Sequence, residues 1–229
     1  MKFKKNKPVV SDSAKEKMPT RLGEIMTDGL PTLVLWNFLF ILTCIPIITI
    51  GPAIAAMSFC TNALVMDERP KKRAALLYFN AFKASFAKAF PLGICFLLVS
   101  ISFGTGFLVY LQFITENMGY LFLASFSLLV LFLFWGVTAH LFPMMFDIEK
   151  TDWKLKKPIL IQKTLRQLIT EAGISAVTRM IPTIIGLVVS VLGLGFIVLY
   201  MPATLPLFLT LAFSAVGVAM AFAHTKSPY

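Results

Sequence analysis

The stretch Pro46-Ile47-Ile48-Thr49-Ile50-Gly51-Pro52-Ala53 interrupts a long apolar region and decides how the chain folds. Proline lacks the N–H that continues a helix and glycine weakens one, so an apolar helix ends here and another begins. The apolar residues before the break, 30–50, are numerous enough to cross a membrane, whereas those after it, 53–66, are few for a crossing. The sequence therefore predicts a membrane hairpin whose second arm is either a tilted short span or half of a re-entrant loop.

The composition of the whole chain is that of a membrane protein. Of its 229 residues, 58% are hydrophobic and 14% are charged, whereas soluble domains are about half apolar and about a quarter charged. The net charge of +10 would favour nucleic acid in a soluble protein. In a membrane protein, Lys and Arg instead mark the cytoplasmic loops, so we expect no nucleic-acid partner. The three cysteines lie in apolar segments at spacings that fit no metal motif, and we expect neither a disulfide nor a metal site.

Apolar stretches recur on both sides of the break and predict an all-α fold, a polytopic transmembrane helical bundle with about six membrane segments. A basic cytoplasmic arm at 1–29 precedes a single transmembrane domain at 30–226. Two polar loops, 67–90 and 147–179, separate groups of spans. The membrane segments are expected at about 30–50, 53–66, 91–114, 120–146, 181–200 and 205–224.

Each polar loop is expected to contain a cytoplasmic amphipathic helix. In the first loop, residues 74–90 place phenylalanines on one face at 100° per residue and Lys88 on the opposite face. Such a helix can lie flat on the membrane or pack against the spans. In the second loop, Pro158 and Gly173 mark the expected start and end of a helix. The phenylalanines of the first helix are Phe79, Phe82, Phe86 and Phe90.

The basic residues determine the expected topology. The arm carries seven Lys and Arg residues, the loops 67–90 and 147–179 carry six and seven, and the tail carries one. If the hairpin returns the chain to its starting side, all 21 lie inside; otherwise seven lie inside and fourteen outside. Because basic residues concentrate on the cytoplasmic side, we expect a returning hairpin and two cytoplasmic termini in a multi-pass membrane protein.

The stretch Trp36-Asn37-Phe38-Leu39 through Cys44-Ile45-Pro46-Ile47-Ile48-Thr49-Ile50-Gly51-Pro52-Ala53, with Ala56 beyond it, resembles the YesL family of bacterial membrane proteins. The family's hallmark reads roughly N-x-L-W…P-I-x-T-I-G-P-A-x-x-A. The Phe-rich helix and Phe142-Pro143…Phe146-Asp147 are similar too, so the resemblance covers most of 22–200. The resemblance implies a protein of the bacterial plasma membrane that is often encoded beside carbohydrate ABC transporters and glycoside-degrading enzymes. It brings no catalytic residues.

The candidate site is the hairpin motif. Asn37 and Asn62, one in each arm, are among the strongest polar residues at membrane depth. Each either makes an interhelical hydrogen bond, worth about 1 kcal/mol, or contacts a substrate. The other residues of the motif are Pro46, Thr49, Gly51 and Pro52.

His140, in the fourth apolar stretch, is a second candidate polar site. Met144 and Met145 follow it, and one His with two Met can in principle hold copper. Because no cysteine or second histidine accompanies them, a structural histidine with hydrogen-bond partners is the favoured interpretation, and we expect no metal and no cofactor.

The sequence indicates no enzyme. It contains no H-E-x-x-H, G-x-S-x-G or Walker motif, and the absence of charge at mid-depth disfavours ion-coupled transport. We expect an accessory or interaction subunit linked to carbohydrate uptake, with an ABC transporter or another membrane protein as partner and anionic headgroups at its basic face. The alternatives are a small stand-alone transporter or channel for a neutral solute, because transporters use helix breaks at depth, and a lipid-binding or membrane-shaping protein.

Overall fold

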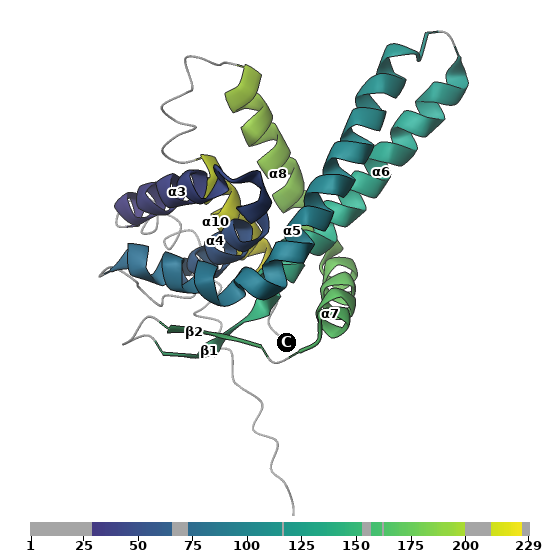
Figure 1. Cartoon of the computed structure of the whole chain (residues 1–229). Helices are drawn as coiled ribbons and strands as arrows, with labels where there is room; N and C mark the ends of the chain where they lie inside the picture. The colour runs from purple at the N-terminus through teal and green to yellow at the C-terminus, as the bar shows by residue number, and fades with distance from the viewer. Residues whose placement is uncertain are drawn as a thin grey trace, which may run out of the picture.

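The computed structural model describes residues 29–65, 73–115, 117–152, 157–161, 163–199 and 212–225. Within these ranges the chain is mostly helical, as its apolar stretches predict, with one short antiparallel β-hairpin (Figure 1). The elements are α3 (Leu30–Cys44), η1 (Ile47–Thr49), α4 (Ile50–Val65), α5 (Ala74–Gln112), α6 (Met118–Leu141), η2 (Pro143–Met145), β1 (Phe146–Asp152), β2 (Lys157–Leu160), α7 (Leu165–Thr178), α8 (Met180–Leu199) and α10 (Ala212–Thr225).

Three helices of the described residues are long and apolar enough to cross a membrane. They are Ile47–Val65, which joins η1 to α4, Ala74–Gln112 and Met118–Met145. A fourth candidate is the pair α7 and α8, if the two count as one span across their 91° bend. These apolar helices indicate a membrane protein, because only helices with internally satisfied backbones, or closed barrels, cross a bilayer.

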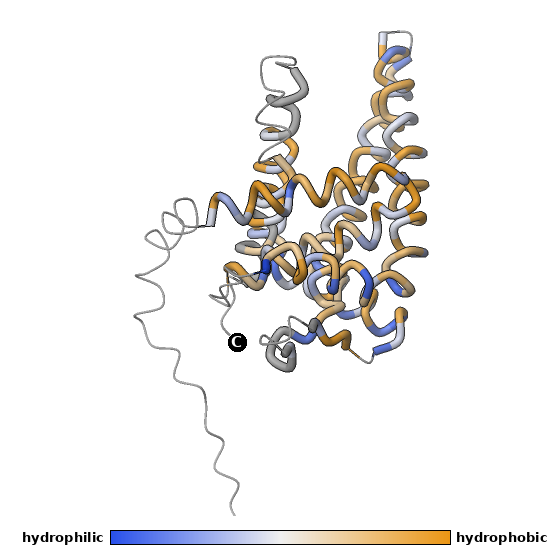
Figure 2. Tube along the Cα trace, turned by 60° about the vertical axis from the view of Figure 1, so that its left-hand side comes forward, coloured by the Kyte–Doolittle hydropathy of each residue, from blue (hydrophilic) through white to orange (hydrophobic). Residues whose placement is uncertain are grey.

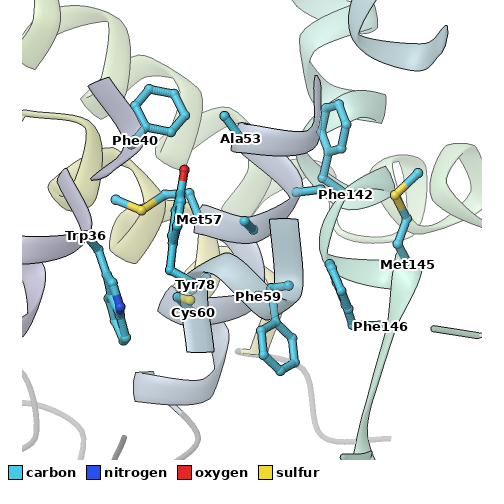
Figure 3. Packing of buried hydrophobic residues seen from close by; sticks show 14 of the residues in the cluster. Trp36, Phe40, Ala53, Met57, Phe59, Cys60, Tyr78, Phe142, Met145 and Phe146 are labelled. Atoms are coloured by element: carbon cyan, nitrogen blue, oxygen red, sulfur yellow. The ribbon is translucent and has the colours of Figure 1, made fainter. Parts of the chain in front are cut away.

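Helix α4 lies at the centre of the core. Twelve of its 16 residues are buried, among them Ala53, Ala55, Ala56 and Phe59, each at 0% exposure. Aromatic and sulfur-containing side chains from α3, α5 and the segment after α6 surround it (Figure 3). Small residues on a central helix let its neighbours approach closely, and large ones around it fill the remaining volume.

The first arm of the predicted hairpin is shorter than expected. Helix α3 ends at Cys44, two residues before Pro46. Its 15 residues extend about 22 Å, which is less than the hydrocarbon thickness of about 30 Å. Figure 1 shows that α3 runs across the direction of the α5–α6 pair. The second arm, α4, begins at Ile50, earlier than the expected residue 53.

Helix α5 combines two segments that the sequence analysis separated. The amphipathic helix at 74–90 and the span at 91–114 form one helix of 39 residues, with Pro91 inside it. At 1.5 Å per residue it is about 58 Å long, so only part of it fits within a bilayer. Figure 1 shows its first part running across the molecule before the chain turns to run beside α6. Proline removes one helical hydrogen bond and bends the axis without ending the helix.

The second predicted amphipathic helix begins later than expected. Pro158 lies in strand β2, which pairs with β1 through Phe146↔Leu160 and Asp147↔Ile159. The helix starts at Leu165 behind a capping box of Thr164 and Gln167, and it continues past Gly173 to Thr178. The prediction from Pro158 and Gly173 was wrong because proline also suits a strand of a two-stranded sheet, and the capping box was the stronger signal.

The remaining spans correspond in part to their expected ranges. Helix α6 begins at Met118, near the expected residue 120, but ends at Leu141 and continues as η2 and strand β1. Helix α8 covers Met180–Leu199, close to the expected 181–200. Of the last span, α10 covers Ala212–Thr225, and residues 205–211 lie outside the described residues. The basic arm at 1–28 and the basic residues at 69–72 also lie outside them.

Candidate functional site

The break between α3 and α4 is built by Pro46 and Thr49. Pro46 has no N–H to donate, and the backbone leaves the α-helical path for the three residues of η1. The Thr49 hydroxyl compensates by donating toward the Thr43 carbonyl and the Pro46 carbonyl, the latter at 2.6 Å. The Thr49 hydroxyl therefore satisfies the Thr43 carbonyl oxygen, which an uninterrupted helix would have paired with a backbone N–H, whereas the Pro46 carbonyl also accepts the Thr49 N–H at 2.8 Å.

Gly51, in the first turn of α4, lies directly against α5. A Cβ atom built at Gly51 would lie 2.1 Å from the Ala89 carbonyl oxygen and 2.7 Å from the Gly93 Cα atom. A Cβ atom at Gly93 would lie 2.4 Å from the Gly51 Cα atom. No side chain fits between the two helices at this point, so both positions require glycine.

Sequence reasoning singled out Gly51 and missed Gly93. The signal for Gly93 was present, because small residues recur every fourth position along α5 and all of them are buried. That spacing forms one helix face on which another backbone can lie closely. Phe79 and Phe86 lie outside this face and are 45% and 40% exposed. The residues of the small face are Ala81, Ser85, Ala89 and Gly93.

Asn37 links the two ends of the described chain. Its side chain is 0% exposed, and its Oδ1 atom accepts hydrogen bonds from the Phe213 N–H at 2.9 Å and the Ser214 N–H at 3.1 Å. These N–H groups belong to the first described turn of α10. Asn37 on α3 therefore caps α10. Of the two roles expected for Asn37, an interhelical hydrogen bond or a substrate contact, the structure shows the hydrogen bond.

Asn62 is also buried but has a different environment. At 1% exposure, its Oδ1 atom has no hydrogen-bond partner among the described residues. Pro52, the remaining residue of the motif, is buried in the first turn of α4, where a missing N–H costs nothing. Neither side chain is open to a solute in this arrangement.

His140 joins three helices. Its Nε2 atom lies 2.7 Å from the Thr183 hydroxyl on α8, and its Nδ1 atom lies 3.5 Å from the Ser175 hydroxyl on α7. The Thr183 hydroxyl donates to the Arg179 carbonyl at 2.7 Å, so the imidazole Nε2–H donates to Thr183. The histidine thus connects α6 to both sides of the bend between α7 and α8.

The predicted site residues therefore do not converge on one pocket. The motif residues contribute a helix break, a close helix contact and a cap, and His140 lies at a different junction. Among the described residues, no group of three or more His, Cys, Asp or Glu side chains is placed to hold a metal ion. The arrangement of these residues packs helices against one another.

Two tertiary contacts that the sequence did not indicate reinforce the hairpin. The buried Trp36 Nε1–H donates to the Ala74 carbonyl at 3.0 Å, and the Tyr78 hydroxyl lies 2.8 Å from the Thr43 hydroxyl. Both join α3 to the start of α5, so the hairpin and the first half of α5 form one unit (Figure 3).

Comparison with known proteins covers this same unit. A family model described as "Protein of unknown function, DUF624" matches residues 33–107, from α3 through most of α5. The match includes both glycines of the close contact and both asparagines, but not His140. No curated protein and no solved structure matches the chain. Over this range the chain is similar to uncharacterised membrane proteins.

Proposed function

We propose that this chain is a non-enzymatic subunit of the bacterial plasma membrane that binds another membrane protein through its α5–α6 hairpin. One observation carries the proposal. In an apolar 18-residue window of α5, 6% of the residues are buried, and in the corresponding window of the helix Met118–Met145, which includes α6, 28% are. Two long apolar helices that leave most of their surface uncovered offer a large contact area to lipid or to other transmembrane helices.

The hairpin is held together along its inner side only. The rings of Phe96 and Phe134 stack at 6.1 Å, and the Trp135 Nε1–H donates to the Ser100 hydroxyl at 3.1 Å. Figure 2 shows that apolar residues continue along both arms of the hairpin. Large side chains cover the outer sides, and those more than half exposed include Leu98, Ile101, Leu108, Phe122, Phe126, Leu129 and Leu133.

A gap in this outer surface favours a helix as the partner. A Cβ atom at Gly104 would meet nothing within 4 Å, so this glycine serves no close contact inside the chain. A small residue on an exposed transmembrane face lets the backbone of a second helix approach. The neighbouring Ile101 and Leu108 would pack on either side of such a helix.

The distribution of charge supports the expected orientation. Residues 113–115 lie at one end of the α5–α6 hairpin, and the β1–β2 hairpin and α7 lie toward the other (Figure 1). Lys163 and Arg166 belong to this second end, where Lys163 pairs with Glu171 at 2.6 Å. The positive-inside rule supports a cytoplasmic location for this end, and we propose cytoplasmic termini on the same ground.

The proposed partner is a permease subunit of an ABC transporter for carbohydrates. This part of the proposal follows from the resemblance to the YesL family, which implies a protein encoded beside carbohydrate ABC transporters. The alternative is a small transporter for a neutral solute, favoured by the helix break at Pro46. Against it, the hydroxyls of Thr43 and Thr49, which flank that break, are engaged in hydrogen bonds within the chain.

Affinity purification from native membranes in a mild detergent tests the proposal. The intact protein should retain a permease subunit in stoichiometric amount, and Gly104→Leu should lose it because the larger side chain blocks the approach of the partner helix. Gly173→Leu on α7 is the matched control, since a Cβ atom at Gly173 also meets nothing within 4 Å. A protein that purifies alone and moves a labelled neutral solute into liposomes would establish the alternative.

A further inference from the structure

A cavity of about 430 Å³ lies where α3, α4, α5, α6, α8 and α10 meet. Its walls are mainly aromatic and aliphatic, and among the described residues no charged side chain lines it. Phe40, Met57 and Phe142 of this wall appear in Figure 3. Ile50 is the residue of the hairpin stretch that lines the cavity, whereas the candidate site residues and His140 do not. The candidate site residues in question are Asn37, Pro46, Thr49, Gly51, Pro52 and Asn62.

Three of the polar side chains in the cavity wall, Thr138, Ser190 and Trp135, donate hydrogen bonds within the chain. The Thr138 hydroxyl donates to the Phe134 and Trp135 carbonyls, and the Ser190 hydroxyl donates to the Gly186 carbonyl. Trp135 donates its N–H to Ser100. A sugar or other polar solute would leave water and replace few of its hydrogen bonds at this mainly apolar wall, whereas an apolar molecule would lose none.

The cavity opens toward an apolar surface. Val191 lines it and is 51% exposed, which places this residue at the rim. The neighbouring Val188 and Leu192 on α8 are 44% and 66% exposed. In a membrane protein, such a surface faces the hydrocarbon of the bilayer, where acyl chains are the molecules present at high concentration.

We propose that this cavity binds a single acyl chain of a lipid. A long-chain hydrocarbon is apolar, flexible and narrow enough to enter between helices, and the volume is within the range of about 300–1,000 Å³ that small-molecule sites have. The acyl chain would fill the space between α4, α6 and α10. It would thereby connect the α3–α4 hairpin to the α5–α6 pair. This inference goes beyond the proposed function and does not depend on the identity of a protein partner.

Trp135 provides the readout. The full-length protein in detergent is titrated with a brominated long-chain fatty acid, whose bromine atoms quench indole fluorescence on contact. We expect the quenching to saturate at about one fatty-acid molecule per protein molecule, as for a single site. Adding unbrominated palmitic acid should reverse it. Trp135→Phe should remove the quenchable part of the signal. If quenching of the unmodified protein never saturates, or if palmitic acid does not reverse it, the proposal is overturned.

A substitution that fills the cavity tests its location. Ala139→Leu adds volume to the wall and should weaken the apparent affinity for the fatty acid by about tenfold or more. Ala87→Leu makes the same change at an exposed position of α5 and should leave the affinity unchanged. Thr138→Val should also leave it unchanged, because that hydroxyl donates within its own helix. Equal affinities for Ala139→Leu and Ala87→Leu would place the fatty acid elsewhere and contradict the proposal.

Mass spectrometry of extracted lipid identifies the natural source of the chain. A phospholipid or a free fatty acid that stays with the unmodified protein through washing, and is lost from Ala139→Leu, supports the site. Retention of the same lipid by both proteins contradicts it.

Discussion

The backbones of α4 and α5 touch at Gly51 and Gly93, where a Cβ atom on either residue would overlap main-chain atoms of the other helix. Gly51 belongs to the helix break and Gly93 follows Pro91, so the contact joins the two places where proline interrupts the regular helix. Because the obstructing atoms are backbone rather than the ends of flexible side chains, the helices must move apart to accept even one methyl group.

The first prediction concerns this contact. Gly51→Ala and Gly93→Ala should each lower the free energy of unfolding by about 1–3 kcal/mol, the usual cost of overpacking a core. Thermal unfolding in detergent measures the effect. Gly104→Ala is the control, because its Cβ atom meets nothing and alanine favours helix. A stability of Gly93→Ala equal to that of the unmodified protein would show that the helices separate at no cost.

The cap on α10 gives a second prediction. Asn37→Ala removes the acceptor of the Phe213 and Ser214 N–H groups and should cost about 1–3 kcal/mol. Hydrogen exchange followed by mass spectrometry should show faster exchange at the start of α10. Ser125→Ala is the control, since this exposed hydroxyl bonds only to the Leu121 carbonyl of its own helix. Unchanged exchange at 213 and 214 would mean that another group caps the helix.

The third prediction concerns the helix break. Thr49→Val keeps the shape of the side chain but removes the hydroxyl that donates toward the Thr43 and Pro46 carbonyls. The variant should lose about 0.5–2 kcal/mol of stability. Thr105→Val on the exposed side of α5 is the matched change and should stay within about 0.5 kcal/mol of the unmodified protein. Equal melting temperatures for the two variants would contradict a role of Thr49 at the break.

A fourth prediction tests whether His140 is structural. In a double-mutant cycle, His140→Ala and Thr183→Val should show a coupling free energy of about 0.5–1.5 kcal/mol, because they share one hydrogen bond. His140→Ala with Ser125→Ala should be additive, since fifteen residues of α6 separate them by roughly 22 Å. Coupling near zero for the first pair, together with stabilisation by added copper, would favour the metal-binding alternative.

The orientation gives a fifth prediction. Single cysteines replace Met118, at the tip of the α5–α6 hairpin, and Gln167, on α7, in a variant without the three native cysteines. Both positions are exposed, so each can react. A maleimide that does not cross membranes should label Met118→Cys on intact cells and should label Gln167→Cys only after the cells are opened. Labelling of Gln167→Cys on intact cells would refute the proposed orientation.

Much of the secondary structure could be predicted because it depends on local properties. Unbroken apolar runs specify helices, and proline with glycine specifies where one of them breaks, so α8 and the break at Pro46 lie close to where they were expected. The same local signals misplaced the helix after Pro158, because a proline fits equally well at the start of a helix and in an edge strand. Which of these forms depends on whether a second strand lies beside it.

The sequence by itself determined that this protein is helical, apolar and charged unevenly along its length, because composition and periodicity are properties of single segments. Only the tertiary structure decided what the singled-out residues do. Asn37 caps a helix 176 residues away, and the role of Gly51 became clear only when Gly93 was found against it. Contacts between distant segments depend on how helices cross in space, which no local pattern specifies.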